Sequence, residues 1–292
     1  MGKDLSEIFP SANNIFHQAD QTLDIPLSSL CWNGPEKELN DTINTQPALL
    51  THSLAALRVF QEHQPGFTPA YVAGHSLGEL SAIVAASALS FSNAVNLTRK
   101  RGQFMKLSGQ LNPGGMAAII GLDILHLEQI CQQASTDDEP VQVANDNCPG
   151  QVVISGSKAA LERAMKLAIA SGARKVIPLA VSIAAHSPLM QAGEEGYNQA
   201  VDSAGIIDPR IPVIGNIHAR PLTSAEQICA DLKLQLTSPV RWTETIQYLI
   251  KKGIDTFFEI GNGTVLIGLL KRIDNRARGF PLGTPKDFEL LA

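Results

Sequence analysis

Ala70-Tyr71-Val72-Ala73-Gly74-His75-Ser76-Leu77-Gly78 is a short apolar run followed by a turn with a glycine at each end, and an alanine-rich segment from Leu77 to Ala88 comes next. This pattern predicts a β-strand, a sharp turn and an α-helix, which is the basic unit of an α/β fold. Both glycines are expected to let the chain turn without a Cβ clash. A serine between two glycines at such a turn is typical of a nucleophile held at the carboxyl end of a strand.

Ser76 is therefore the candidate nucleophile. Free N–H groups and the dipole at the start of the following helix favour a developing negative charge. The N–H of Leu77, the residue after the serine, is the expected oxyanion donor. Short motifs also occur by chance, so a glycine-rich turn without chemistry stays open as an alternative.

A serine nucleophile needs a base, and the sequence has seven histidines. His75 precedes the serine on the turn and should point away from it. His186 follows an apolar strand from Val181 to Ala185, and His218 lies in a loop from Gly215 to Arg220. Element ends often carry catalytic residues, so we favour His186 while keeping His218 as the alternative. The remaining histidines lie in polar helical segments, where a solvated side chain is the default: His17, His52, His63 and His126.

A run of positive charge, Arg99-Lys100-Arg101-Gly102, lies in a helix predicted from Asn93 to Ser108. One interpretation is an ordinary solvated helix face. The other is that an arginine of this run enters the serine site, where a guanidinium would hold a substrate carboxylate through two hydrogen bonds.

The remaining pattern predicts a large α/β domain that contains a small inserted one. Residues 1–40 are polar and are expected to be irregular apart from a helical stretch around Ala19. Apolar residues at spacings of three and four predict a helix from Gln46 to His63. Near the other end, more strand and helix of the large domain is predicted in three segments: Pro209 to Gly215, Trp242 to Lys251 and Thr256 to Ile260.

From Met116 the predicted elements follow the order β-α-β-β-α-β, which is that of a ferredoxin-like unit. Residues 145–150 are expected to form the turn between its two middle strands, and Lys175 to Val181 its last strand. We therefore predict a small domain over residues 115–182, and a large domain over residues 1–114 and 183–292.

Composition narrows the class of protein. The 292 residues are 44% hydrophobic and 17% charged, which indicates a folded chain long enough for one or two cores. A net charge of −5 argues against a nucleic-acid binder that neutralises phosphates. The four cysteines lie far apart with no CxxC pair, so we expect no metal site, no disulfide framework and reduced thiols in a cytoplasm. No run of 18 apolar residues predicts a membrane span.

A set of short motifs runs along nearly the whole chain: Thr45-Gln46-Pro47-Ala48, Gly74 to Glu79, Arg101-Gly102, Asn147 to Gly156, His186 to Met190, Ser238 to Trp242, and Glu259-Ile260-Gly261. In this order they resemble the malonyl-CoA:acyl carrier protein transacylases of bacterial fatty acid synthesis. This resemblance implies an α/β-hydrolase-like large domain with an inserted ferredoxin-like small domain.

The resemblance also implies roles for single residues. Ser76 matches the serine that is acylated, His186 its general base, and Arg101 the arginine that holds the malonyl carboxylate. Gln235 matches a glutamine whose backbone carbonyl orients the histidine, which would explain why no acid stands out as a triad partner. The substrate-binding set that we expect is Arg101, Leu77, Gln235 and Asn147.

The implied reaction moves a malonyl group from malonyl-CoA to the 4′-phosphopantetheine thiol of acyl carrier protein through a malonyl-serine, in two half-reactions. It implies no cofactor and no metal, and we expect a cytoplasmic monomer with no nucleic-acid or membrane partner. Carrier proteins are acidic, so basic side chains are docking candidates against the alternative of ordinary surface charge: Arg99, Lys100, Lys106, Lys271 and Arg272.

Two departures from the family pattern are visible. The family has a strand and a Gly-Gln-Gly-Ser-Gln loop before the stretch found here at Met1 to Leu5. We expect either a start that lies upstream or a large domain weakened in fold and rate by the loss of that strand and glutamine. Gly261 to Leu266 also lacks a lysine that the family usually has after its second glycine, where this chain has Thr264.

Four other functions stay open. A thioesterase or esterase would share the covalent serine, although its histidine usually lies near the C-terminus. A poorly active subunit that mainly binds carrier or partner proteins would fit the first departure. A trans-acting acyltransferase of polyketide synthesis and a transacylase subunit of malonate decarboxylase would both share the motifs.

Overall fold

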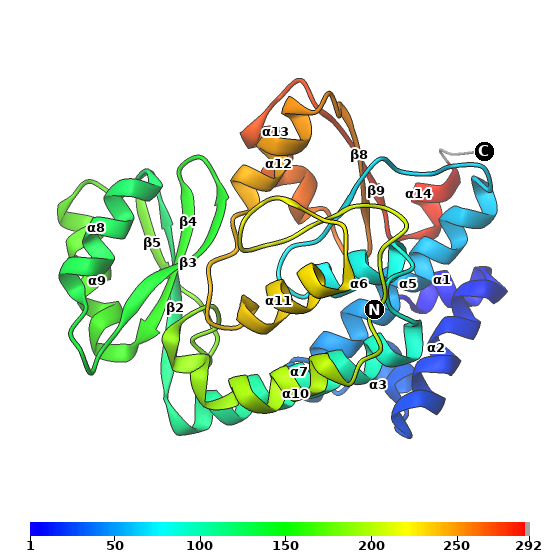
Figure 1. The fold of residues 1–292 in the computed structure, drawn as a ribbon, viewed down its shortest axis with the longest axis horizontal. Helices are drawn as coiled ribbons and strands as arrows, with labels where there is room; N and C mark the ends of the chain where they lie inside the picture. Colours follow the sequence, from blue (N-terminus) through cyan, green and yellow to red (C-terminus); the bar gives the residue numbers. More distant parts are fainter. Residues whose placement is uncertain (290–292) are drawn as a thin grey trace.

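The structure is a computed structural model that describes residues 1–289 as a mixed α/β protein (Figure 1). This confirms the predicted α/β class. A small sheet with its helices lies at one end of the molecule, and the remaining helices and short strands form the larger part (Figure 1). The candidate serine lies in the larger part.

The first part of the chain is helical rather than irregular, so that prediction was wrong. Its helices are α1 (Lys3–Ile8), α2 (Pro10–Leu23), α3 (Leu27–Asn33), α4 (Glu36–Leu39) and α5 (Thr42–His63). Leu5, Phe16 and Leu27 are fully buried in the main hydrophobic core. Several of these helices are too short to show a clear apolar period, and tertiary packing stabilises them instead.

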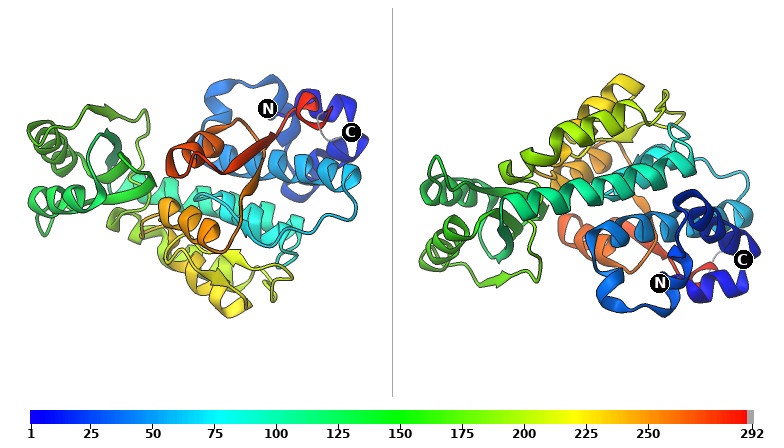
Figure 2. Two further views of the ribbon diagram at one scale, coloured as in Figure 1. Left: turned by 90° about the horizontal axis from the view of Figure 1, so that it is seen from above. Right: turned by 90° about the horizontal axis from the view of Figure 1, so that it is seen from below.

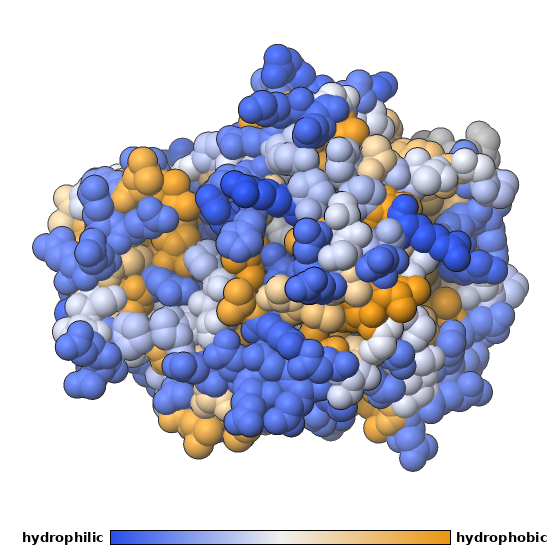
Figure 3. Space-filling view, viewed as in Figure 1, coloured by the Kyte–Doolittle hydropathy of each residue, from blue (hydrophilic) through white to orange (hydrophobic). Residues whose placement is uncertain are grey.

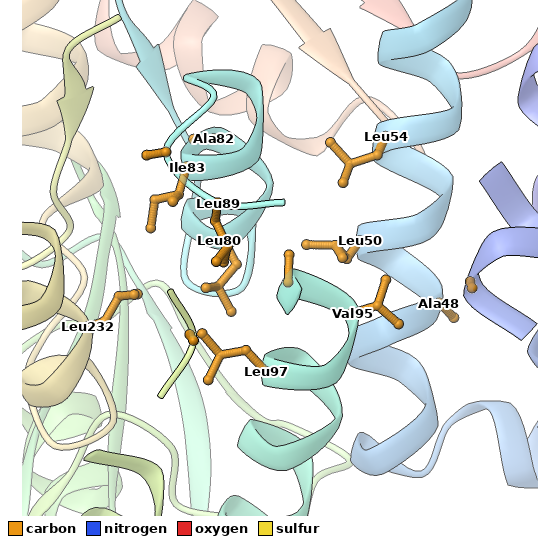
Figure 4. Close-up of a cluster of buried hydrophobic side chains, with 14 of the residues drawn as sticks. Ala48, Leu50, Leu54, Leu80, Ala82, Ile83, Leu89, Val95, Leu97 and Leu232 are labelled. Atoms are coloured by element: carbon orange, nitrogen blue, oxygen red, sulfur yellow. The ribbon is translucent and has the colours of Figure 1, made fainter. Parts of the chain in front are cut away.

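The predicted strand–turn–helix unit is present in shortened form. It comprises β1 (Val72–Ala73) and α6 (Gly78–Ala85), followed by α7 (Phe91–Leu111). β1 pairs in parallel with β6 (Val213–Ile214), which pairs antiparallel with β7 (Pro221–Leu222). Leucines and other apolar residues of α5, α6 and α7 pack around this unit, as the close-up in Figure 4 shows.

The small sheet has its own core. Its elements are β2 (Gly114–Ile120), α8 (Ile124–Ala134), β3 (Val141–Cys148), β4 (Gln151–Ser157), α9 (Lys158–Ala170) and β5 (Lys175–Pro178). The four strands lie in the order β3-β4-β2-β5, and every neighbouring pair is antiparallel. A hydrophobic cluster between Ala117 and Ala168 fills the space under α8 and α9. The long helix α7 leads from the larger part into this sheet (Figure 2).

The turn predicted over residues 145–150 is shorter than expected. β3 continues to Cys148, so only Pro149 and Gly150 connect it to β4. Asn145 forms a parallel bridge with Val240, and the Asp146 N–H donates to the Val240 carbonyl at 2.9 Å. Asparagine and aspartate are poor strand formers, and the pairing with Val240, which is distant in sequence, keeps Asn145 and Asp146 extended.

The last third of the chain returns to the larger part. It contains η1 (Pro188–Gly193), α10 (Glu194–Asp202), α11 (Ala225–Gln235), α12 (Trp242–Lys251), β8 (Thr256–Ile260), α13 (Val265–Ile273), β9 (Arg278–Leu282) and α14 (Pro285–Glu289). The bounds of α12 and β8 coincide with two of the segments that were predicted to supply strand and helix. β8 and β9 form a separate parallel pair.

The surface in Figure 3 mixes hydrophilic and hydrophobic residues, with hydrophilic ones gathered in its lower middle. Within residues 1–289, no helix has the length and apolar character needed to cross a bilayer. The four cysteines are unpaired, and three of them are buried.

Candidate active site

Ser76 lies on the turn between β1 and α6 with a φ of 52°, in the left-handed region that residues other than glycine rarely adopt. A Cβ at Gly74 would lie 2.0 Å from the carbonyl carbon and oxygen of Gly78, so only glycine fits there. A Cβ at Gly78 would meet nothing within 4 Å. The expectation that both glycines are sterically required is therefore wrong for Gly78.

Asn216, which follows β6, fixes the serine turn from the neighbouring strand. Its Oδ1 accepts the N–H of Ser76 at 2.7 Å, and its Nδ2 donates to the Gly74 carbonyl at 2.8 Å. The side chain is buried, with 2% of its surface exposed. Sequence reasoning missed this residue because nothing in its local pattern distinguishes it from a loop asparagine.

His186 is the histidine that the structure brings to the serine. Its Nε2 lies 2.8 Å from Ser76 Oγ. Its Nδ1 donates to the backbone carbonyls of Gln235 at 2.9 Å and Ser238 at 3.1 Å. Because carbonyls only accept, the ring proton must sit on Nδ1, and Nε2 is left as the acceptor for the serine hydroxyl.

The backbone of His186 is also constrained. It has a φ of 58°, so both members of the Ser–His pair hold left-handed conformations. Gln142 on β3 donates through Nε2 to the His186 carbonyl at 2.8 Å and to the Thr237 carbonyl at 2.9 Å. The small sheet therefore contributes directly to the position of the base, which the sequence did not indicate.

The electrostatic surroundings keep the histidine neutral. Burial, and after it the positive charge of Arg101, lower the pKa of His186 to about 3. The ring is only 3% exposed. At neutral pH the imidazole is thus unprotonated and able to take a proton.

Arg101, on α7, enters the site rather than facing solvent. It is 2% exposed, and its Nη2 lies 3.2 Å from Ser76 Oγ. Gln235 Oε1 accepts from its Nε at 3.2 Å and its Nη2 at 2.8 Å. Gln46 Oε1 accepts from Nη1 at 2.7 Å, and Met105 Sδ lies 3.3 Å from the same nitrogen. All of these acceptors are neutral.

No ion pair found within residues 1–289 includes Arg101. Burial lowers the pKa of its guanidinium, yet arginine stays protonated in proteins. The site therefore holds a buried positive charge beside the serine hydroxyl that makes no direct ion pair within the described chain, although the charge of Glu79 acts on it from further away.

The other predicted site residues lie at different distances from the serine. Leu77 follows it directly, at the start of α6. Asn147 Oδ1 accepts a hydrogen bond from His75 Nε2 at 2.8 Å, so its partner is the residue before the serine. His75 also packs against Trp242, with 5.6 Å between the ring centroids. His218 is exposed.

His52 departs from the solvated default. It is 3% exposed and its Nε2 lies 3.0 Å from the Gly283 carbonyl, so it belongs to the packing of α5 against the C-terminal segment. Within the described chain, no group of three or more His, Cys, Asp or Glu side chains could hold a metal ion.

Three of the predicted docking residues already have partners. Lys106 pairs with Asp41, and Arg99 donates to the Asn44 side chain and the Ile43 carbonyl. Arg272 donates to Gln151. Lys100 and Lys271 are exposed.

Comparison with known proteins gives one consistent result. The family model "Acyl transferase domain" matches residues 1–275. The malonyl CoA-acyl carrier protein transacylase of Bacillus subtilis is 46% identical over 290 residues, which are 99% of this chain and 91% of the relative. The protein of the same name from Staphylococcus aureus strain MW2 is 40% identical over 287 residues, 98% of this chain and 92% of the relative.

Solved structures agree. The malonyl CoA-acyl carrier protein transacylase of Coxiella burnetii superposes with a TM-score of 0.96 at 39% identity, over 99% of this chain and 91% of that one. A malonyl-transacylase solved in complex with a type II polyketide acyl carrier protein also gives 0.96 at 39% identity, over 100% of this chain and 94% of that one.

Proposed function

Because the chain belongs to the acyl transferase family, with malonyl CoA-acyl carrier protein transacylases as relatives, we propose that it transfers malonyl groups from malonyl-CoA to acyl carrier protein. The product would supply chain elongation in fatty acid synthesis. Ser76 is the nucleophile, His186 the general base, and Arg101 the group that binds the malonyl carboxylate.

In the first half-reaction His186 Nε2 takes the proton of Ser76 Oγ, and that oxygen attacks the thioester carbonyl. The 2.8 Å separation is within the reach that general-base catalysis needs. The Leu77 N–H, at the start of α6, stabilises the negative oxygen of the tetrahedral intermediate. The C–S bond then breaks, His186 returns the proton to the sulfur of CoA, and a malonyl ester remains on Ser76.

The burial of the Arg101 guanidinium beside Ser76 is the observation that supports malonyl as the transferred acyl group. A charge held by neutral acceptors 3.2 Å from the nucleophile suits an acyl group with a free carboxylate at its far end. Acetyl-CoA, which has no carboxylate, would leave that charge unpaired. A hydrolase for neutral esters would have no use for it.

In the second half-reaction the attacking nucleophile is the thiol of the carrier's phosphopantetheine, rather than water or CoA. His186 takes the thiol proton, the sulfur attacks the malonyl ester, and the Ser76 oxygen recovers the proton as it leaves. The exposed lysines Lys100 and Lys271 stay docking candidates for the acidic carrier. Asn147 supports the substrate pocket indirectly in this scheme, through His75.

The finer description of the molecule belongs to the same proposal. We describe the larger part as α/β-hydrolase-like because the serine lies between parallel-paired β1 and α6. The strand order β3-β4-β2-β5 supports a ferredoxin-like small domain over residues 115–182, inserted between residues 1–114 and 183–292. A cytoplasmic monomer without nucleic-acid or membrane partners fits the net charge of −5 and the unpaired cysteines.

Intact-mass spectrometry after brief incubation with malonyl-CoA tests the proposal. One malonyl adduct per chain is expected, and it should be absent from the Ser76→Ala variant. Adding carrier protein that bears phosphopantetheine should move the malonyl group to the carrier, whereas carrier without the prosthetic group should leave the adduct in place.

Two results would contradict the proposal. Free malonate released without an adduct or transfer would indicate a thioesterase. A folded protein that forms no adduct but retains carrier in a pull-down would indicate a binding subunit.

A further inference from the structure

Two buried carboxyl groups lie behind the site and take no direct part in the reaction proposed above. Glu79 on α6 is fully buried, and Asp231 on α11 is 5% exposed. Glu79 Oε1 and both Asp231 oxygens have no hydrogen-bond donor among the described residues. The two side chains act on each other as hydrogen-bonding partners. Two ionised carboxylates only accept, so a bond between them requires a proton on one.

We propose that Glu79 and Asp231 share a single proton, with Glu79 as the donor. We further propose that this pair positions Gln235 and the segment after β6, which together hold the candidate active site. This inference rests on the proposed function for its effect on catalysis. The presence of the shared proton does not depend on the proposed function.

The first group that the pair positions is Gln235, which lies one turn beyond Asp231 on α11. Its Nε2 donates to Glu79 Oε2 and, at 3.2 Å, to the Ser76 carbonyl. With Nε2 anchored in this way, the amide oxygen must face Arg101, and the backbone carbonyl of the same residue holds His186. Glu79 therefore acts on the base and on the carboxylate-binding group through one side chain.

The second group that the pair positions is the chain segment after β6. The backbone N–H groups of Asn216 and Ile217 lie close enough to lower the pKa of Asp231 without completing a hydrogen bond to its oxygens. A Cβ at Gly215 would lie 2.6 Å from Asp231 Oδ1, which shows how closely this segment packs on the carboxyl group. Asn216 in turn holds the Ser76 N–H. The Asn216 N–H acts on Glu79 as well, so this segment packs against both carboxyl groups.

The charges around the pair agree with one shared proton. Burial, then the negative charge of Asp231, raise the pKa of Glu79 well above its ordinary value. Burial also raises the pKa of Asp231, while its bond with Glu79 lowers it. The other titratable groups facing the pair are Arg101 on α7, Tyr197 on α10 and His218 after β6. The pair then carries one negative charge near the single positive charge of Arg101.

The sign of the pH dependence follows. A carboxyl group with a raised pKa in the folded state binds its proton more tightly there than in the unfolded chain. The stability that this proton gives is therefore lost as pH rises from about 4.5, the ordinary value for Glu79, through the raised value. A glutamine at position 79 donates to Asp231 and accepts from Gln235 without titrating, so it should remove this dependence.

Infrared spectroscopy of the whole protein without substrate is the first test. The carbonyl band of a protonated carboxylic acid is expected at neutral pH in the native protein and in Glu62→Gln, which removes an exposed carboxylate of α5. It should be missing from Glu79→Gln. In Asp231→Asn, the band should disappear at a lower pH than in the native protein, because the neighbouring negative charge is gone. If Glu79→Gln leaves the spectrum of the native protein unchanged, the shared proton is disproved.

Unfolding and kinetics give the second test. As pH rises, the free energy of unfolding of Glu79→Gln should increase relative to that of the native protein. The difference between Glu62→Gln and the native protein should stay constant with pH. Glu79→Gln should keep at least about a third of the native rate of serine malonylation, and Glu79→Ala should lose about tenfold or more, because it leaves buried polar groups unpaired. Equal losses in the two variants would overturn the positioning role. A protein that shows the infrared band but forms no malonyl adduct would contradict the proposed function and leave the shared proton standing.

Discussion

The backbone carbonyl of Gln235 accepts the Nδ1 proton of His186 at 2.9 Å, where a carboxylate would stand in a serine triad. The side chain of the same glutamine holds Arg101 through its amide oxygen. One residue thus orients the proposed base through its main chain and the proposed carboxylate-binding group through its side chain. Substitution of the side chain should separate the two effects.

Gln235→Glu should weaken binding of malonyl-CoA in particular, in addition to a loss of rate with every substrate, because the donor that anchors this residue on Glu79 and the Ser76 carbonyl is removed. A carboxylate at this position would pair with Arg101 and compete with the malonyl carboxylate. We expect KM for malonyl-CoA to rise about tenfold or more, a loss of about 1.4 kcal/mol. Steady-state kinetics with acetyl-CoA as the comparison substrate check this, since its KM should change little. An equal rise for both substrates would contradict the assignment.

Arg101→Ala should remove the preference for a carboxylate-bearing acyl group. Losing a charge-assisted hydrogen bond costs about 1.5–3 kcal/mol, so kcat/KM for malonyl-CoA should fall by roughly 10- to 100-fold relative to that for acetyl-CoA. Lys100→Ala, one residue earlier on the same helix and exposed, is the matched control. Unchanged discrimination in Arg101→Ala would show that another group binds the carboxylate.

The charge of Arg101 should also set the acid limit of serine reactivity. His186 acts as a base only when neutral, and its pKa of about 3 keeps it neutral in mild acid. Burial is the larger cause of that low pKa, and Arg101 the next, so Arg101→Ala should raise the pKa partway toward 6.5. The rate at which a fluorophosphonate labels Ser76 should therefore drop between pH 7 and 5 more steeply in the variant. Parallel pH profiles would refute this coupling.

Gln142→Ala should lower activity although Gln142 touches neither substrate nor serine. Its loss leaves the carbonyls of His186 and Thr237 without their donor and frees the segment that carries the base. We expect kcat to fall by about 5- to 30-fold with KM little changed, from one or two hydrogen bonds of about 1 kcal/mol each. Gln133→Ala, on the exposed side of α8, should behave as the native protein. A change in KM alone would place Gln142 in substrate binding instead.

Two glycines inside helices give opposite expectations for stability. A Cβ at Gly102 would lie 2.6 Å from the Thr42 carbonyl oxygen, so Gly102→Ala should force α7 away from α5 and cost about 1–3 kcal/mol. A Cβ at Gly268 on α13 would meet nothing within 4 Å, so Gly268→Ala should stabilise the fold by about 0.5–1 kcal/mol. Chemical denaturation of the two variants checks both, and changes of the same sign would contradict the close approach of α5 and α7.

Local pattern was enough to predict the strand–turn–helix unit around Ser76 and the bounds of α12 and β8. It failed in residues 1–40, where short helices depend on burying single side chains such as Leu5 and Leu27 in a core built by later segments. It failed again at Asn145, where a bridge to Val240 extends β3. In both places, partners far along the chain decide the local structure.

The candidate site divides in the same way. Ser76, His186 and Arg101 stand in recognisable motifs, and the structure brings these three together. Gln142 and Asn216 stand in ordinary polar surroundings, and only the fold shows that they hold the base and the serine turn. A polar side chain whose task is to hold another residue has no local spacing rule, which is why sequence reasoning missed it.

The guanidinium of Arg101 is buried without a direct ion pair among the described residues, which trades thermal stability of the fold for substrate selectivity. A charge taken out of water without a direct counter-charge lowers the stability of a fold, and a well-packed apolar replacement commonly restores it. Selection for heat tolerance alone should therefore favour an apolar residue at this position, yielding a sturdier protein that no longer distinguishes malonyl from acetyl groups. The same reasoning makes bound malonyl-CoA a stabiliser, since its carboxylate supplies the missing counter-charge.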